Sequence, residues 1–338
     1  MGRMGRVARM LVAALVTLFI IVPVTAWTAL ALWYRVPAPA AVRLLAAAMF
    51  IVLAMASAVR LFTGRRRRAL VAFGLAFGLV LIWWNTIEPA AKADWAADVA
   101  RQTTGKLDGD RLTVTDLRDF DWHDDATFTE RWATRSYDLS HLRTLDLFMS
   151  YWAGPQMAHI IMSFGFDDGE HLAWSIEVRR TRNGVFSPVA DLFKSSPLVI
   201  LAASERDVVG VRATVRGEDV RLFRLRIPMD RARLLLLEYV DDANALAARP
   251  AFYNSITTNC TTTVVKLIRA AGGHLPFDWR LIVNGYLPGF LYDRGVVDTR
   301  MPLRKLTERA RINERAAQAW NSPEFSRLIR VGVPLPFE

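Results

Sequence analysis

The sequence has one cysteine, Cys260, and its surroundings are those of a helix start. Asn259 and Thr261 to Thr263 flank it, and these residue types are common in helix caps and first turns. Apolar residues then recur at helical spacing before the stop signal Gly272-Gly273: Val264, Leu267, Ile268 and Ala271. A thiol at a helix N-terminus feels the positive end of the backbone dipoles, which favours thiolate over thiol. Cys260 is therefore a candidate nucleophile, and the alternative is a small buried hydrophobic residue.

A histidine lies in residues 158–180, AHIIMSFGFDDGEHLAWSIEVRR, which predict a β-hairpin. The turn is Asp167-Asp168-Gly169, which fits a three-residue loop with Gly169 in the left-handed conformation. The register that follows pairs Phe166 with Glu170, Ser163 with Ala173, Ile161 with Ser175 and His159 with Glu177. One face of the hairpin is then apolar and consists of Ala158, Ile160, Met162, Phe164, Trp174, Ile176 and Val178.

The opposite face of this hairpin carries the polar residues His159, Ser163, Ser175 and Glu177. A histidine across from a carboxylate is held in orientation, and its imidazolium form is favoured. Glu177 is therefore the predicted partner of the imidazole, with Ser175 as the second choice. The alternative is a His–Glu pair on a solvated surface.

A strand-borne histidine and a cysteine at the start of a later helix are the components of a thiol nucleophile site. The thiolate attacks an acyl carbon, and the histidine accepts and returns the proton. Backbone N–H groups near Cys260 and Thr261 are placed to bind an oxyanion, with Asn259 and Arg179 in the wall of the site. Because 101 positions separate His159 from Cys260, their proximity is a hypothesis about the tertiary structure.

The other segments of the chain predict the elements that surround this site. In order, they are a hairpin over 106–122, a strand, polar loop and strand over 198–216, a half-buried strand over 219–227, a helix over 229–250 and an aromatic, glycine-rich loop wall over 276–298. The sequence has no phosphate-binding glycine loop and no cluster of metal ligands. We therefore expect neither a cofactor nor a metal ion.

The charge of the chain is distributed unevenly. The net charge is +10, yet residues 1–87 hold ten arginines and no acidic residue. The remaining 33 basic residues balance the 33 acidic residues of the rest of the chain. The C-terminal region therefore has no net positive charge to attract nucleic acid, and we expect no nucleic-acid partner.

The N-terminal region is apolar enough to enter a membrane. Three runs, Met10–Trp33, Ala40–Phe62 and Ala69–Ile87, are each of a length that crosses a hydrocarbon core of about 30 Å. The first run could instead be a cleaved signal peptide, but it is long for one and two more runs follow it. We therefore predict three transmembrane helices over residues 1–87 and a juxtamembrane linker over 88–105.

The orientation of these helices follows from their arginines. The N-terminus carries three arginines and the loop after the second run carries Arg65 to Arg68, whereas the loop after the first run has one. Arginine-rich segments stay in the cytoplasm. We therefore predict a bacterial inner-membrane protein with a cytoplasmic N-terminus and a periplasmic region after Ile87.

Several segments of the soluble region resemble one family. AHIIMSFGFDDG, SIEVRR, ERDVV and RPAFYNSITTNCTT are similar to the N-terminal periplasmic domain of the lipoprotein N-acyltransferase Lnb, over roughly residues 105–300. The order of histidine before cysteine also resembles circularly permuted papain-like enzymes, including the lecithin:retinol acyltransferase type. In this family pattern the cysteine and the histidine correspond to Cys260 and His159. Lnb itself carries its membrane spans after this domain, whereas here three spans precede it.

The resemblance implies a fold and a reaction. It implies an α+β, permuted papain-like domain over 106–300, with an antiparallel sheet packed on the cysteine-bearing helix, and a helical tail over 301–338. It also implies acyl transfer through an acyl-cysteine thioester, from a membrane phospholipid to an amine such as a lipoprotein N-terminus. Two alternatives are a papain-like amidase or peptidase that acts on peptidoglycan, and a non-catalytic envelope binding domain in which Cys260 is structural.

Overall fold

The chain divides into two compact units in a computed structural model that describes residues 3–64 and 66–336. Unit 1 comprises residues up to Pro89 together with Ser187–Ser195. Unit 2 comprises Ala90–Phe186 and the residues from Ser196 onward. Arg65, which belongs to the arginine-rich loop, lies outside the described residues.

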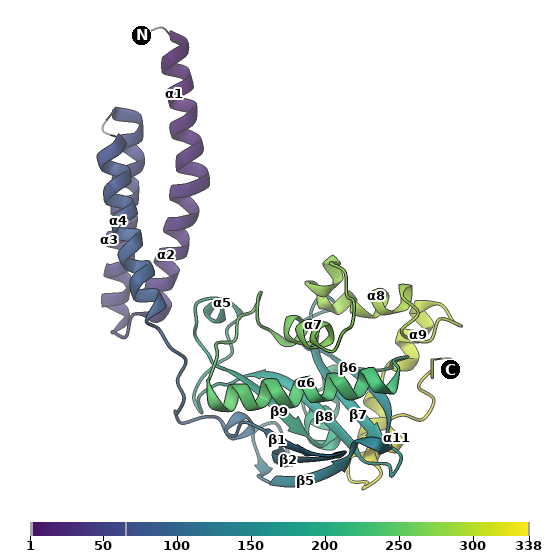
Figure 1. Cartoon of the computed structure of the whole chain (residues 1–338). Coiled ribbons are helices and arrows are strands. Elements are labelled where there is room, and N and C mark those ends of the chain that lie inside the picture. The colour runs from purple at the N-terminus through teal and green to yellow at the C-terminus, as the bar shows by residue number, and fades with distance from the viewer. Residues whose placement is uncertain (1–2, 65, 337–338) are drawn as a thin grey trace. The chain divides into compact units, whose positions relative to one another are not determined.

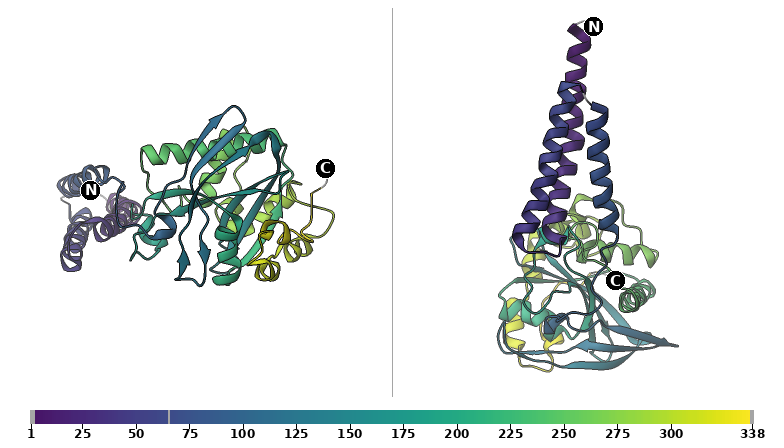
Figure 2. Two further views of the ribbon diagram at one scale, coloured as in Figure 1. Left: turned by 90° about the horizontal axis from the view of Figure 1, so that it is seen from below. Right: turned by 90° about the vertical axis from the view of Figure 1, so that its left-hand side faces the viewer.

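Unit 1 contains the three predicted membrane helices, which lie side by side (Figure 2). Their elements are α1 (Arg3–Val16), η1 (Thr17–Ile21), α2 (Val22–Arg35), α3 (Ala40–Thr63), α4 (Arg66–Asn85) and the short α5 (Pro188–Asp191). Three continuous helical stretches, Met4–Arg35, Ala40–Thr63 and Arg66–Asn85, are long and apolar enough to cross a membrane. Most of their large apolar side chains are exposed, as expected of helices whose solvent is lipid.

The first of these helices is irregular next to its proline. Pro23 has no N–H group for the carbonyl one turn earlier, and the π-helical segment η1 ends two residues before it. The wider π-helical turn Thr17–Ile21 accommodates the lack of this hydrogen bond, and the helix continues to Arg35. The first membrane-spanning candidate therefore accommodates a proline within its length.

Unit 2 is built on an eight-stranded sheet in the order β1-β2-β9-β8-β7-β6-β10, with β5 paired to β2. The strands are β1 (Thr104–Asp108), β2 (Arg111–Arg118), β5 (Trp132–Asp138), β6 (Leu142–Tyr151), β7 (His159–Phe166), β8 (His171–Val178), β9 (Leu198–Ala203) and β10 (Asp219–Arg224). A separate two-stranded ribbon is formed by β3 (Asp121–Trp122) and β4 (Phe128–Thr129). The sheet is mixed, because β2 and β9 pair in parallel where Arg118 meets Ala203. The antiparallel sheet that the resemblance implies is thus present, with one parallel pair in it.

The hairpin β7–β8 has the predicted register. Ile161 lies opposite Ser175 and Ser163 opposite Ala173. Gly169 has φ 88°, in the left-handed region that the three-residue loop requires. The alternation of apolar and polar residues was sufficient to determine this pairing, because a shift by one residue would put the polar side chains of one strand into the apolar core under α6 and α7.

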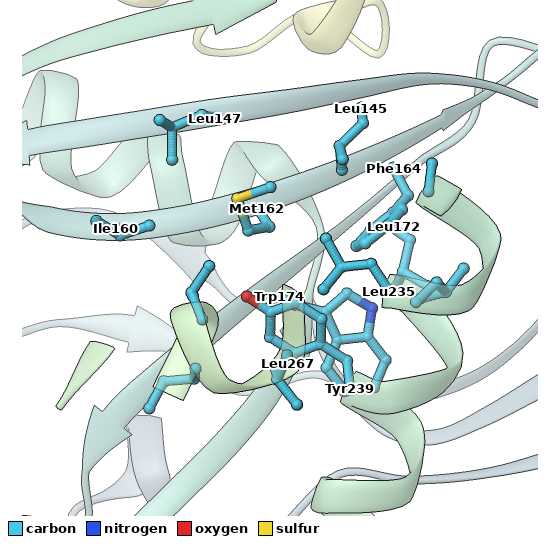
Figure 3. Packing of buried hydrophobic residues seen from close by; sticks show 14 of the residues in the cluster. Leu145, Leu147, Ile160, Met162, Phe164, Leu172, Trp174, Leu235, Tyr239 and Leu267 are labelled. Carbon is cyan, nitrogen blue, oxygen red and sulfur yellow. The ribbon is translucent and has the colours of Figure 1, made fainter. Parts of the chain in front are cut away.

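One face of the sheet is covered by two long helices, α6 (Met229–Ala248) and α7 (Cys260–Ala270) (Figure 1). Figure 3 shows this core, where the Trp174 ring lies 5.5 Å from the Tyr239 ring of α6 and Leu267 of α7 is close by. The short helices η5 (Trp279–Leu281), η6 (Asn284–Tyr286), α8 (Leu287–Asp293) and α9 (Leu303–Ala310) extend the same layer. Burial of these aromatic and aliphatic side chains is the main force that fixes α7 against the strands.

The other face of the sheet is covered by η4 (Arg206–Val215), α10 (Asn313–Ala319) and α11 (Phe325–Leu328). Residues after Met301 are thus an integral part of the core of unit 2. The remaining short helices, η2 (Ala97–Val99) and η3 (Leu139–His141), lie in connections.

The segment 206–215 is a π-helix, and the prediction of a second strand within 198–216 is wrong. Its β-branched residues favoured a strand. In the folded chain Asp207 is fully buried and accepts hydrogen bonds from Arg118, from the Trp122 indole and from the Phe120 N–H, at 2.8–3.0 Å. These tertiary contacts outweigh local propensity, and they require Asp207 and the following apolar residues to lie on one helical surface.

Candidate active site

The helix α7 begins at Cys260, as predicted. Asn259 is its N-cap, and the Asn259 side chain accepts hydrogen bonds from the N–H groups of Thr261 and Thr262, both at 2.9 Å. The Thr262 hydroxyl in turn accepts from the Asn259 N–H at 2.8 Å, which completes a capping box. The cysteine is buried, with 8% of its surface exposed, and lies at the positive end of the helix.

This cap changes the expected oxyanion site. The Thr261 N–H already donates to Asn259 Oδ1, and a buried donor engaged in a cap is not available to a substrate oxygen. Asn259 therefore acts on the helix backbone, and its contribution is to start the helix at the cysteine. The prediction that the Thr261 N–H binds an oxyanion is corrected on this ground.

The structure brings His159, Ser175 and Glu177 together at one end of the hairpin. His159 Nε2 lies 2.8 Å from Ser175 Oγ and 3.1 Å from Glu177 Oε1. The serine hydroxyl donates to Glu177 Oε1 at 2.7 Å. Because a hydroxyl has one proton, which Ser175 gives to Glu177, Ser175 Oγ accepts from the His159 Nε2–H. Both predicted partners thus contact the same ring nitrogen.

The imidazole is also a hydrogen-bond partner of the Cys260 thiol. His159 is the first residue of β7 and Cys260 the first residue of α7. The two side chains meet although α7 packs on the apolar face of the sheet, because both lie at the ends of their elements. The backbone N–H of Ile160 also donates to the sulfur.

The electrostatics favour an ion pair between sulfur and imidazole. Burial lowers the pKa of His159, but Glu177 and the hydrogen bond to Cys260 raise it, to about 9. Burial raises the pKa of Cys260, but the hydrogen bond and charge of His159 outweigh it, so the thiol pKa is lowered. Burial likewise opposes ionisation of Glu177, yet His159 and Arg212 hold its pKa well below its usual range. A thiolate facing an imidazolium is the form that attacks carbonyl carbon.

The segment that holds all of these residues, 128–285, matches the family model of the Lnb N-terminal periplasmic domain. This protein contains an Lnb N-terminal periplasmic domain. A search of the curated proteins and a search of the solved structures gave no match. The family and the α+β domain expected from the sequence are confirmed, with three apolar helices before the domain.

One residue of the site in this Lnb domain was not predicted, namely Arg212 on η4. Its Nη2 donates to Glu177 Oε1 at 2.9 Å, and its Nη1 lies 3.3 Å from Glu218 Oε2. The guanidinium is buried between the two carboxylates, so it fixes the Glu177 carboxylate that in turn orients His159. No local pattern could have indicated Arg212, because the segment was expected to be a strand.

Arg179, expected in the wall of the site, is held elsewhere in the Lnb domain. Its Nε and Nη2 donate to the carbonyls of Val99 and Ala100 at 3.1 and 2.6 Å. The guanidinium also lies 4.8 Å from the centre of the Trp95 ring. Arg179 therefore anchors the juxtamembrane segment to the sheet, and Arg212 takes the charged position beside Glu177.

A second residue missed by the sequence reasoning is Asn284, in the segment predicted as the loop wall of the site. Its Nδ2 donates to the Ala158 carbonyl at 2.6 Å and to the Thr261 hydroxyl at 2.7 Å. Its Oδ1 accepts from the Ala158 N–H at 2.9 Å. Asn284 thus connects the residue before His159 to the residue after Cys260.

Proposed function

We propose that this protein is a membrane-anchored, cysteine-dependent acyltransferase that faces the periplasm. One observation carries the proposal, namely that the imidazole of His159 pairs with the Cys260 thiol within an Lnb N-terminal periplasmic domain. The acyl donor is a membrane phospholipid and the acceptor is an amine such as a lipoprotein N-terminus. The order of histidine before cysteine supports a permuted papain-like arrangement of the site.

In the first half-reaction, the Cys260 thiolate attacks the ester carbonyl of the phospholipid. The developing oxyanion is stabilised by the Cys260 N–H at the start of α7. The tetrahedral intermediate collapses by breaking the ester C–O bond, and the His159 imidazolium gives its proton to the leaving alkoxide. The products are a lysophospholipid and an acyl-Cys260 thioester.

In the second half-reaction, the acceptor amine attacks the thioester carbonyl. The neutral His159 takes a proton from the amine, and the Cys260 thiolate leaves as the C–S bond breaks. Glu177 stays ionised throughout and stabilises the imidazolium, while Ser175 and Arg212 keep the carboxylate in place. The site thereby returns to the thiolate–imidazolium form.

The membrane topology is part of the proposal. We propose that each of the three helices long and apolar enough to span a bilayer crosses it once, so that the N-terminus and the folded domain lie on opposite sides. The arginines at the N-terminus and after α3 favour the cytoplasmic side for those segments. The domain after α4 then lies in the periplasm, where phospholipids of the outer leaflet are at high local concentration.

Intact mass spectrometry of the protein purified from membranes tests this function. We expect a fatty-acyl adduct on Cys260 that neutral hydroxylamine removes, and no adduct in Cys260→Ala or His159→Asn. The absence of an adduct in the unmodified chain after incubation with phospholipid vesicles would overturn the proposal. Release of peptidoglycan fragments that depends on Cys260 would favour the amidase or peptidase alternative instead.

A further inference from the structure

The exposed aromatic side chains of unit 2 are concentrated in a few loops. Within the described residues of this unit, they are Trp152, Phe186, Phe277, Trp279 and Tyr286. Met157 and Ile282, which are also exposed, lie in the same loops. A water-soluble surface seldom gathers large apolar side chains in this way without a binding partner.

These loops contact one another. The Trp152 and Phe186 rings are 5.9 Å apart, and the Trp279 and Tyr286 rings are 5.4 Å apart. The two pairs are joined through the backbone, since the Gly285 N–H donates to the Gln156 carbonyl at 2.9 Å. A Cβ at Gly285 would lie 2.1 Å from the Pro155 carbonyl oxygen, so the loops are packed as closely as glycine allows. We call the surface formed by Trp152, Met157, Phe186, Trp279, Ile282 and Tyr286 the apolar rim.

The apolar rim adjoins the candidate active site. Met157 is two residues before His159, and Ile282 is two residues before Asn284. Asn284 contacts Ala158 on one side and Thr261 on the other. The apolar rim is therefore continuous with the start of β7 through Met157 and, through Asn284, with the start of α7.

The chain itself indicates what covers this surface. Three helices long and apolar enough to cross a membrane are covalently attached to the domain. Directly after Phe186, residues Ser187–Ser195 belong to the unit of these helices, where the Phe193 ring lies 5.7 Å from Tyr34 and 6.5 Å from Trp84. Tryptophan and tyrosine are also the side chains that prefer the interface between lipid and water.

We propose that the apolar rim docks into the periplasmic surface of the lipid bilayer. This inference rests on the acyl-transfer function proposed above. In that reaction, the ester group of a phospholipid passes from the membrane across the apolar rim to Cys260. The ligand class is a diacyl lipid in a bilayer, and the aromatic side chains replace water around the acyl chain as it leaves the membrane.

A spin label tests the docking without any catalysis. Cys260→Ala removes the only cysteine, so a single label is placed with Ile282→Cys, or with Val331→Cys as the control. Ile282 is 67% exposed and Val331 is 57% exposed, but Val331 neighbours the α10–α11 core on the opposite face of the sheet. The full chain is reconstituted in vesicles of phosphatidylethanolamine and phosphatidylglycerol.

We expect the label at Ile282 to be relaxed by oxygen and protected from a water-soluble nickel complex, and the label at Val331 to show the reverse. Equal access of the nickel complex to both labels would overturn the docking. Dipolar broadening between labels at Ile282 would also overturn it, because the rim would then be covered by a second copy. Since these variants lack Cys260, the result is independent of whether the acyltransferase proposal holds.

A second measurement connects the rim to the reaction. In Ile282→Asp, we expect acylation of Cys260 by vesicle phospholipid to fall relative to acylation by a water-soluble short-chain ester, by about tenfold. Val331→Asp should leave this ratio unchanged. An unchanged ratio in Ile282→Asp would overturn delivery through the rim. Absence of acylation in the parent chain would instead overturn the proposed function.

Discussion

The side-chain amide of Asn284 donates a hydrogen bond to the hydroxyl of Thr261 at 2.7 Å. The same nitrogen donates to the Ala158 carbonyl. Asn284 therefore spans the two segments that carry the thiol and the imidazole, although it is far from both in the sequence. Asn284 therefore helps to set the distance between Cys260 and His159, together with the hydrogen bond from the Ile160 N–H to the sulfur.

Asn284→Ala should separate the two halves of the site. We expect a loss of about 1–3 kcal/mol in the free energy of unfolding, because the buried groups of Ala158 lose their partner. We also expect the rate of Cys260 acylation to fall by about 10- to 100-fold, since small displacements of reacting groups are costly. Asn244→Ala is the control, as Asn244 binds the Gly105 N–H and carbonyl in the same manner far from the site. Equal losses of acylation in both variants would contradict a positioning role.

His159→Asn should change the reactivity of the thiol. Burial raises the pKa of Cys260, and the variant lacks the hydrogen bond and the charge of the His159 imidazolium, which lower it. We expect the midpoint of the iodoacetamide alkylation profile to move from below the ordinary value for cysteine to above it. The rate is followed by mass spectrometry from pH 5 to pH 10. A profile that is identical in the two proteins would show that Cys260 is not paired with His159.

Glu177→Gln should shift the alkaline limb of activity. The pKa of His159 is about 9 because of Glu177, while burial and Arg212 both lower it. Because the pKa of His159 is higher in the folded state than its ordinary value of 6.5, protonation of His159 stabilises the fold. This contribution to the free energy of unfolding is complete below about pH 6.5 and is lost as the pH rises through about 9. In Glu177→Gln we expect acylation to decline with rising pH about one unit or more earlier. Ser175→Ala removes only the neutral hydroxyl between His159 and Glu177. It should therefore shift the alkaline decline of acylation by less than Glu177→Gln does.

Asp207→Ala should destabilise unit 2. Its carboxylate and Arg118 are a buried ion pair, with 0% and 5% of their side chains exposed. Removing one partner leaves the other charge buried, at a cost of about 3–5 kcal/mol in urea unfolding. Asp121→Ala removes a half-exposed carboxylate paired with Arg206 and should cost less than about 1 kcal/mol. A small effect of Asp207→Ala would show that the buried pair does not stabilise the fold.

The proposed topology predicts which loops are accessible from outside the cell. In a Cys260→Ala chain, Pro37→Cys lies between α2 and α3, and Thr63→Cys lies at the end of α3. We expect a membrane-impermeant maleimide to label position 37 in intact spheroplasts, and position 63 only after permeabilisation. Labelling of position 63 from outside would reverse the orientation of the whole chain.

Local sequence patterns determined the elements that depend on neighbours in the chain. The run lengths of apolar residues defined the three helices of unit 1, because the thickness of a membrane is constant. Polar–apolar alternation and the turn at Gly169 determined the β7–β8 register, and with it the approach of His159 to Glu177. The capping residue Asn259 likewise determined that α7 begins at Cys260.

Only the tertiary structure decided which distant groups complete the site. Arg212 reaches Glu177 because burial of Asp207 turns a strand-like segment into a helix, and Asn284 reaches Thr261 because the loop after α7 folds back over the sheet. Arg179, by contrast, donates its hydrogen bonds to the backbone carbonyls of the juxtamembrane segment and not to the site. Such contacts arise from packing between segments many residues apart, where burial and charge pairing outweigh the local preferences that a sequence pattern records.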